Sequence, residues 1–68
     1  MPLAQIYLWK GISEEIIKNV IEGVTDVFVD IGIPKQAVEV LVNETPKAHW
    51  GIGGLPATED RPEAKPPQ

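Results

Sequence analysis

The chain has 68 residues, no cysteine and one histidine, and its ten acidic and six basic side chains give a net charge of −4 at pH 7. Without cysteine it has neither a disulfide framework nor a thiolate metal site, and His49 cannot hold a metal by itself. Its basic residues form no cluster, so nucleic acid is not an expected partner. No apolar run approaches the roughly 20 residues of a membrane span, and the N-terminus lacks the layout of a signal peptide, so we expect a cytoplasmic protein without a membrane partner.

The first predicted element is a β-strand from Leu3 to Trp9. This stretch is short, apolar and rich in residues that favour strands. Gly11 ends it. Successive side chains of a strand point to opposite faces, which places Leu3, Gln5, Tyr7 and Trp9 on one face and Ala4, Ile6 and Leu8 on the other.

A helix is predicted next. Ser13 can cap its first turn, where Glu14 and Glu15 suit the positive end of the helix dipole. Gly32 is placed to end the helix in a left-handed turn, and Pro34 prevents it from resuming. Apolar residues recur at three- and four-residue steps and form one stripe that should face a sheet: Ile17, Val20, Ile21, Val24, Val27, Phe28 and Ile31.

The third predicted element is a strand at about Val38–Glu44, in which valines alternate with other residues. Strand, helix and strand make a β-α-β unit with parallel strands and a right-handed connection. Such a unit leaves both sheet edges and one sheet face uncovered. A chain of this length also buries only about 60% of its unfolded surface. We therefore expect the chain to associate with other copies.

Two further segments follow Trp50. The stretch Gly-Ile-Gly-Gly at residues 51–54 permits a tight turn or a short strand against a neighbour, and we interpret it as an interface arm. Residues 57–68 have few apolar side chains, several prolines and mixed charges, a composition typical of a flexible tail. The sequence thus predicts one domain at residues 1–56 and a flexible C-terminal tail at residues 57–68.

Pro2, directly behind Met1, has two interpretations. It can simply start the strand, where a missing N–H is tolerated. Alternatively, removal of Met1 leaves Pro2 with a free secondary amine. An α-amino group titrates near pH 7.7–8.0, so about a tenth to a sixth of it is neutral at pH 7. Apolar surroundings lower the pKa of an amine and would make Pro2 a suitable general base.

Several motifs together resemble the short-chain tautomerase family typified by 4-oxalocrotonate tautomerase. They are PLAQIYLWKG from Pro2, the Ser-Glu-Glu helix start, VEVLVNE, and PKAHWGIGG ending at Gly54. The resemblance implies an α+β fold with a β-α-β protomer, dimers that form a four-stranded sheet, and a hexamer made of three dimers. It also implies a cofactor-independent isomerase that uses Pro2 as general base or acid in keto-enol tautomerisation of a small enol or oxo acid.

The chain departs from the family pattern at two positions. Family members carry one arginine at the helix start and another in the second strand, and these hold the carboxylates of a dioate substrate. The corresponding residues here are Ile12 and Glu39. Arginine suits bidentate recognition of a carboxylate, whereas Glu39 would repel a dicarboxylate. Lys10 and Lys35 could replace the arginines only as flexible point charges.

Three hypotheses for function follow. The chain is a tautomerase with an atypical substrate, with Pro2 as base and Trp50, Leu8 and Glu39 in contact with substrate. Alternatively, it is one subunit of a heterohexamer whose paralogous sister chain supplies the arginines. In the third, the fold persists in a non-catalytic oligomeric protein.

Each candidate side chain also has a plainer interpretation. Trp50 can plug a subunit interface instead of lining a pocket, and Glu39 can be a solvated or ion-paired side chain. Leu8 and Ile52 are weaker candidates than Trp50 for the apolar wall. We expect a structural role for His49 and an interface or core position for Tyr7 and Trp9.

Overall fold

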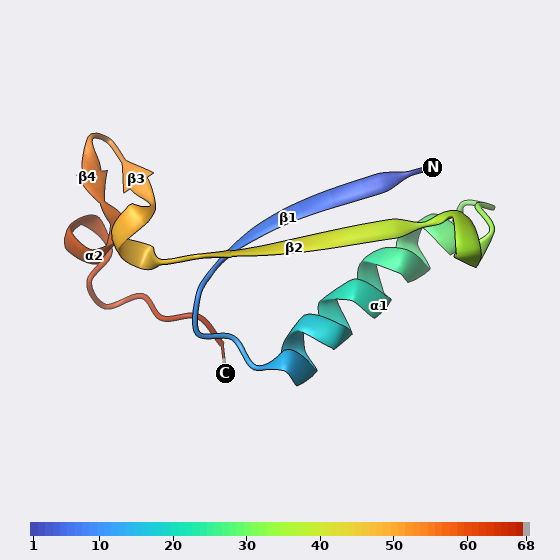
Figure 1. Cartoon of the computed structure of the whole chain (residues 1–68), viewed down its shortest axis with the longest axis horizontal. Coiled ribbons are helices and arrows are strands. Elements are labelled where there is room, and N and C mark those ends of the chain that lie inside the picture. The colour runs from blue at the N-terminus through green and yellow to red at the C-terminus, as the bar shows by residue number, and fades with distance from the viewer. Residues whose placement is uncertain (68) are drawn as a thin grey trace.

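The computed structural model of the chain describes residues 1–67. Two parallel strands form a sheet, α1 covers one face of it, and a small hairpin and a short helix extend from one end (Figure 1). The predicted β-α-β unit is confirmed. The elements in chain order are β1 (Leu3–Trp9), α1 (Glu14–Asp30), the 3-10 turn η1 (Lys35–Ala37), β2 (Glu39–Thr45), the 3-10 turn η2 (Lys47–His49), β3 (Gly51–Ile52), β4 (Leu55–Pro56) and α2 (Ala57–Asp60).

The β1–β2 sheet has one covered and one open face. The strands pair in register from Leu3 opposite Glu39 to Trp9 opposite Thr45. Alternation leaves Leu3, Tyr7 and Leu41 on the open face, where they are 56%, 57% and 48% exposed. Ala4, Ile6 and Leu8 of β1 and Val40 and Val42 of β2 point to the other face and are half-buried. Strand β2 begins and ends one residue later than predicted, because Val38 closes the preceding turn η1.

Helix α1 has the predicted ends. The Ser13 hydroxyl accepts a hydrogen bond from the backbone N–H of Ile16 at 3.3 Å, which satisfies one of the free donors of the first turn. Gly32 has a φ of +101°, and its N–H donates to the carbonyl of Val29 at 2.9 Å. A residue with a Cβ rarely adopts this left-handed conformation, so glycine is required to end the helix there.

The apolar stripe of α1 is wider than the sheet that it covers. Ile17, Val20, Val24 and Phe28 are half-buried, whereas Val27 and Ile31 are 61% and 71% exposed. The prediction that the stripe faces a sheet is therefore confirmed for its half-buried residues, whereas Val27 and Ile31 lie outside that contact in this protomer. Two strands lie only about 4.8 Å apart, so they cover the middle of a broad stripe and leave its flank open.

Strands β3 and β4 form a two-residue hairpin. They pair antiparallel, with Ile52 opposite Leu55, and Gly53 and Gly54 form the turn at φ values of +60° and +90°. Positive φ at both central positions is the signature of a type I′ turn, which matches the twist of the flanking strands. The prediction of a tight turn is confirmed. Its role as an interface arm stays a prediction.

Regular structure continues beyond residue 56, the predicted end of the domain. Helix α2 follows β4 directly, and Ala57 at its start is fully buried. The N–H of Ala57 donates to the carbonyl of Trp50 at 2.6 Å, and this bond ties α2 to the hairpin. Flexibility of the tail stays a prediction.

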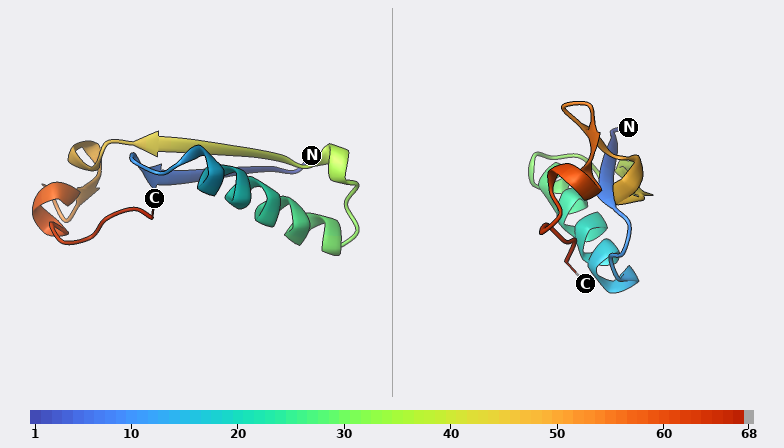
Figure 2. Two further views of the ribbon diagram at one scale, coloured as in Figure 1. Left: turned by 90° about the horizontal axis from the view of Figure 1, so that it is seen from below. Right: turned by 90° about the vertical axis from the view of Figure 1, so that its left-hand side faces the viewer.

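A single protomer encloses only a small core. Among residues 1–67 only Ile12 and Ala57 are buried apolar residues. The accessible surface is 5023 Å², whereas a folded monomer of this mass exposes about 4,200 Å². The radius of gyration is 14.5 Å, against about 11 Å for a compact domain of this length. The elongated outline is clear in Figure 2. These values indicate a protomer that needs further surface to pack against.

None of the helices in the described part of the chain has the length and apolar character needed to cross a membrane.

Candidate active site

Pro2 and Glu39 lie together at one end of the sheet. The Pro2 carbonyl accepts a hydrogen bond from the N–H of Glu39 at 2.9 Å, and the next residue, Leu3, is the register partner of Glu39. The amino group of Met1 donates to the carbonyl of Ala37 at 3.1 Å. Pro2 is half-buried and Glu39 is exposed. With Met1 attached, the Pro2 nitrogen is part of a tertiary amide. Removal of Met1 converts it into a secondary amine.

Trp50 lies at the other end of the sheet, where it meets Trp9. The two rings are 6.1 Å apart between centroids and nearly perpendicular, at 86°. This edge-to-face arrangement is favourable for aromatic pairs. Trp50 closes turn η2, since its N–H donates to the carbonyl of Lys47 at 3.3 Å. The indole nitrogen of Trp9 is buried and has no hydrogen-bond partner among residues 1–67.

One protomer does not bring the predicted site residues together. Leu8 is six residues from Pro2 along β1, which corresponds to about 20 Å in a strand. Trp50 follows the end of β2 and Ile52 belongs to β3 of the hairpin, which lies far from the N-terminus (Figure 1). No pocket is present in the part of the chain that the structure describes. Pro2 and Glu39 therefore meet Leu8 or Trp50 only where another copy contributes them.

The two positions where the family resemblance implies arginines lie in different environments. Ile12 is only 9% exposed and belongs to the small core. Glu39 begins β2, and its register with Leu3 puts its side chain on the open face of the sheet. Ile12 is therefore a packing residue in this protomer. Glu39 pairs with Leu3, the residue after Pro2, and so places a carboxylate near Pro2.

Lys47 is a further residue of this region, and the sequence patterns did not predict it. Its Nζ lies 4.9 Å from the centroid of the Trp9 ring and donates hydrogen bonds to the carbonyls of Arg61 and Ala64. No local motif marks this lysine, although its position three residues before Trp50 puts it on the same turn. His49 is exposed on that turn. Within residues 1–67 no group of three or more histidine, aspartate or glutamate side chains could hold a metal ion.

Comparison with known proteins decides the family. The family model described as "Tautomerase enzyme" matches residues 2–60. The chain belongs to the tautomerase family. The match begins at Pro2 and includes both ends of the sheet, the hairpin and α2. The resemblance inferred from the sequence motifs is thus confirmed, and this tautomerase is an isomerase.

Individual relatives agree with this assignment. The chain is 48% identical over 60 residues to a 2-hydroxymuconate tautomerase of Comamonas testosteroni, covering 87% of this chain and 95% of the relative. The crystal structure of TomN, a 4-oxalocrotonate tautomerase homologue of the tomaymycin biosynthetic pathway, superposes with a TM-score of 0.85 at 33% identity. It covers 91% of this chain and 97% of TomN.

A third relative is an assembly of unlike chains. A chain of the heterohexameric 4-oxalocrotonate tautomerase from Chloroflexus aurantiacus J-10-fl superposes with a TM-score of 0.80 at 26% identity. The superposition covers 90% of this tautomerase and all of the relative's chain. The three comparisons each cover most of both chains, so the likeness belongs to the whole protomer and not to one motif.

Proposed function

We propose that this tautomerase moves a proton between the oxygen and a carbon of a small enol or oxo acid, with the amine of Pro2 as general base and then general acid. The observation that carries the proposal is that the family match begins at Pro2. Removal of Met1 is the step that makes the amine available. No cofactor is required, because the reaction only relocates a proton and a double bond.

The position of Pro2 suits this role. It directly precedes β1, and its carbonyl accepts a hydrogen bond from the N–H of Glu39, which holds the backbone of Pro2 against β2. A rigid secondary amine directs its lone pair in one direction. Apolar surroundings would lower its pKa toward the working pH, where a general base is most effective.

Those surroundings come from more than one copy. The accessible surface exceeds that of a compact monomer, and the open face exposes Leu3, Tyr7 and Leu41. Leu8 and Trp50 lie far from Pro2 within one protomer, so a neighbouring copy supplies them as the apolar wall. We propose a hexamer built from three dimers as the assembly that completes the site.

The substrate differs from that of the relatives. 2-Hydroxymuconate, the compound in the relatives' name, carries two carboxylates. Ile12 is buried and offers no charge, and Glu39 presents a carboxylate close to Pro2. Like charges repel at short range. A neutral or singly charged enol is therefore a better substrate for a site made of this chain alone.

Steady-state kinetics on the processed chain test the proposal. We expect turnover of phenylenolpyruvate, which has one carboxylate, with a higher kcat/KM than for 2-hydroxymuconate. Pro2→Ala should lower kcat/KM by roughly 10²–10⁴, the usual contribution of a general base. Glu39→Arg should shift the preference toward 2-hydroxymuconate, and Glu39→Gln is the matched control that removes charge without adding a donor. Full activity of Pro2→Ala would overturn the assignment of the base.

A second candidate function is favoured by the heterohexameric relative. In this version the chain is one subunit, and a paralogous chain contributes the arginines that Ile12 and Glu39 do not provide. Co-expression with a paralogous chain, followed by native mass spectrometry, distinguishes the two. A mixed hexamer that turns over 2-hydroxymuconate, together with an inactive pure chain, would favour the second. A pure chain that is inactive and forms no mixed assembly would favour a non-catalytic protein.

A further inference from the structure

The carboxyl end of the sheet carries a segment that the proposed chemistry does not use. Residues 61–66, here called the strap, leave α2 and turn back toward the connection between β1 and α1 (Figure 1). The N–H of Ala64 donates to the carbonyl of Arg61 at 3.2 Å and forms a turn in the strap. Farther on, the Pro66 ring is only 3.5 Å from where a Cβ on Gly11 would lie. The strap therefore lies against its own protomer at its far end.

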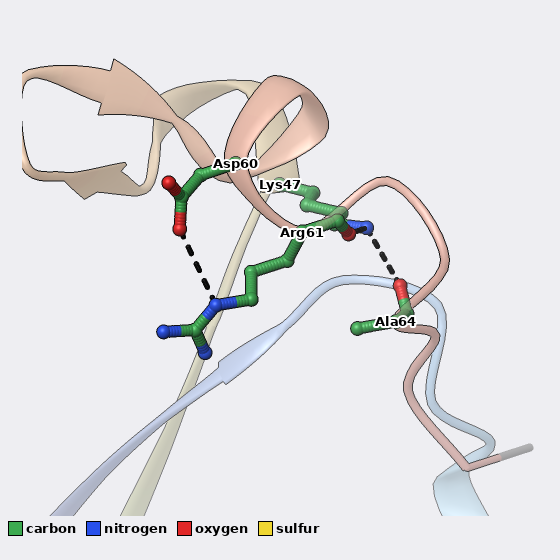
Figure 3. A network of polar contacts seen from close by, with 4 residues as sticks. All are labelled: Lys47, Asp60, Arg61 and Ala64. Atoms are coloured by element: carbon green, nitrogen blue, oxygen red, sulfur yellow. Dashed lines mark hydrogen bonds and ion pairs between the residues drawn. The ribbon is translucent and has the colours of Figure 1, made fainter.

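Lys47 contacts the strap at two points. Its Nζ donates to the carbonyl of Ala64 at 2.6 Å and to the carbonyl of Arg61 (Figure 3). The same Nζ lies 4.9 Å from the centroid of the Trp9 ring. An ammonium has three N–H donors and is attracted to the face of an aromatic ring. Two carbonyls and an indole face thus form a nearly complete environment for one cation.

We infer that Lys47 is a latch that holds the strap closed over the end of the sheet and thereby fixes the ring of Trp50. Lys47 and Trp50 belong to one turn, and Trp9 contacts both of them. When Lys47 loses its hydrogen bonds to the strap, the Trp9 and Trp50 rings lose the contact that holds them on that side. Lys47 is accordingly a positioning residue, since it acts on the proposed apolar wall through Trp9 and Trp50. Only its effect on turnover rests on the proposed function. The latch itself does not depend on the proposed function.

The composition of the strap favours a flexible tail, and the latch supplies contacts that oppose this flexibility. The strap does not have to bury apolar side chains, because its main-chain carbonyls accept charge-assisted hydrogen bonds. Pro62 and Pro66 also restrict the unfolded strap and reduce the entropy lost when it closes. The ion pair between Asp60 and Arg61, at 3.3 Å, lies on the exposed rim and is a weaker contact (Figure 3).

Hydrogen exchange of the full-length chain tests the latch. Two backbone amides of the strap donate hydrogen bonds, Arg61 to the carbonyl of Ala57 at 2.8 Å and Ala64 to the carbonyl of Arg61 at 3.2 Å. Lys47→Met keeps the length of the side chain and removes its donors, so we expect exchange at these amides to rise by at least about tenfold. Exchange in β1 and β2 should not change. Lys65→Met, the same substitution at an exposed lysine of the strap, is the matched control and should behave like the wild type.

Two further variants keep the test decisive if Lys47→Met fails to fold. Lys47→Arg retains donors and should preserve most of the protection. Lys47→Gln retains an N–H donor without the positive charge, so it should protect the strap less than Lys47→Arg does. If the latch positions Trp50, Lys47→Met also raises KM more than it lowers kcat.

The latch and the proposed base can fail separately. Equal strap exchange in Lys47→Met and the wild type would overturn the latch, whatever the activity. Protection that disappears on dilution to protomers and does not depend on Lys47 would also overturn it, because another copy would then hold the strap. Full activity of Pro2→Ala would overturn the base and leave the exchange result standing.

Discussion

Leu41 offers the most direct test of the open sheet face as an assembly surface. It lies in the middle of β2 on the same face as Leu3 and Tyr7. We consider two substitutions at this position. Leu41→Ala removes part of an apolar surface, and Leu41→Glu places a carboxylate there. Neither should disturb the isolated protomer strongly, because the side chain does not belong to its small core.

The expected size of the effect follows from the exposure of Leu41. Complete burial of a leucine side chain stabilises by about 1.5–3 kcal/mol. Since 48% of Leu41 is exposed in the protomer, assembly can gain about 0.7–1.4 kcal/mol from it per copy. Leu41→Ala should therefore weaken association about three- to tenfold per copy. Leu41→Glu should dissociate the assembly, because burying an unpaired charge costs several kcal/mol per ion.

Native mass spectrometry and sedimentation velocity measure this directly. We expect Leu41→Glu to sediment as a smaller species and to lose tautomerase activity at the same protein concentration. Asn19→Glu is the matched control, since it adds one negative charge at an exposed position of α1. If Leu41→Glu assembled like the wild type, the open face would not be an interface and the explanation of the excess surface would be wrong.

Three predictions concern the protomer and are measured by thermal or urea unfolding. Ser13→Ala should lower the free energy of unfolding by about 1 kcal/mol, because the cap to Ile16 is lost; no change would mean that the cap does not stabilise α1. Gly54→Ala should cost about 1–2 kcal/mol, since Gly54 has a φ of +90°; a stability gain would contradict the type I′ turn. Ile12→Arg should cost several kcal/mol, as it buries an unpaired charge, whereas Glu39→Arg on the exposed position should stay within about 0.5 kcal/mol of the wild type; equal effects would contradict the different environments of the two positions.

Local patterns in the sequence predicted most of the fold. Alternation along Leu3–Trp9, the Ser13 cap and the glycine at residue 32 act within a few residues, so they can be interpreted from the chain alone. The exposed flank of α1 could not be predicted in this way. A stripe such as Val27 and Ile31 shows that a surface is apolar, but whether the same chain or another copy covers it depends on the width of the sheet.

The site was predictable in identity but not in arrangement. The Met-Pro start and the Trp-Gly-Ile-Gly-Gly motif suggested Pro2 and Trp50 as partners, yet the structure puts them at opposite ends of one sheet. Distance in space between such residues depends on how copies assemble, and one sequence does not encode that in a local pattern. The role of Lys47 could not be predicted from the sequence for a related reason. Its partners are backbone carbonyls, and those carry no side-chain signature.

The central claim is that the amine of Pro2, once free, performs the proton transfer. Preparations that differ in the fraction of chains lacking Met1 can be obtained by varying methionine removal during expression, and intact mass gives that fraction. The decisive measurement is the rate of tautomerisation per chain in each preparation. The account predicts a rate proportional to the fraction without Met1, with no activity when every chain retains it. A rate that does not depend on that fraction would contradict it.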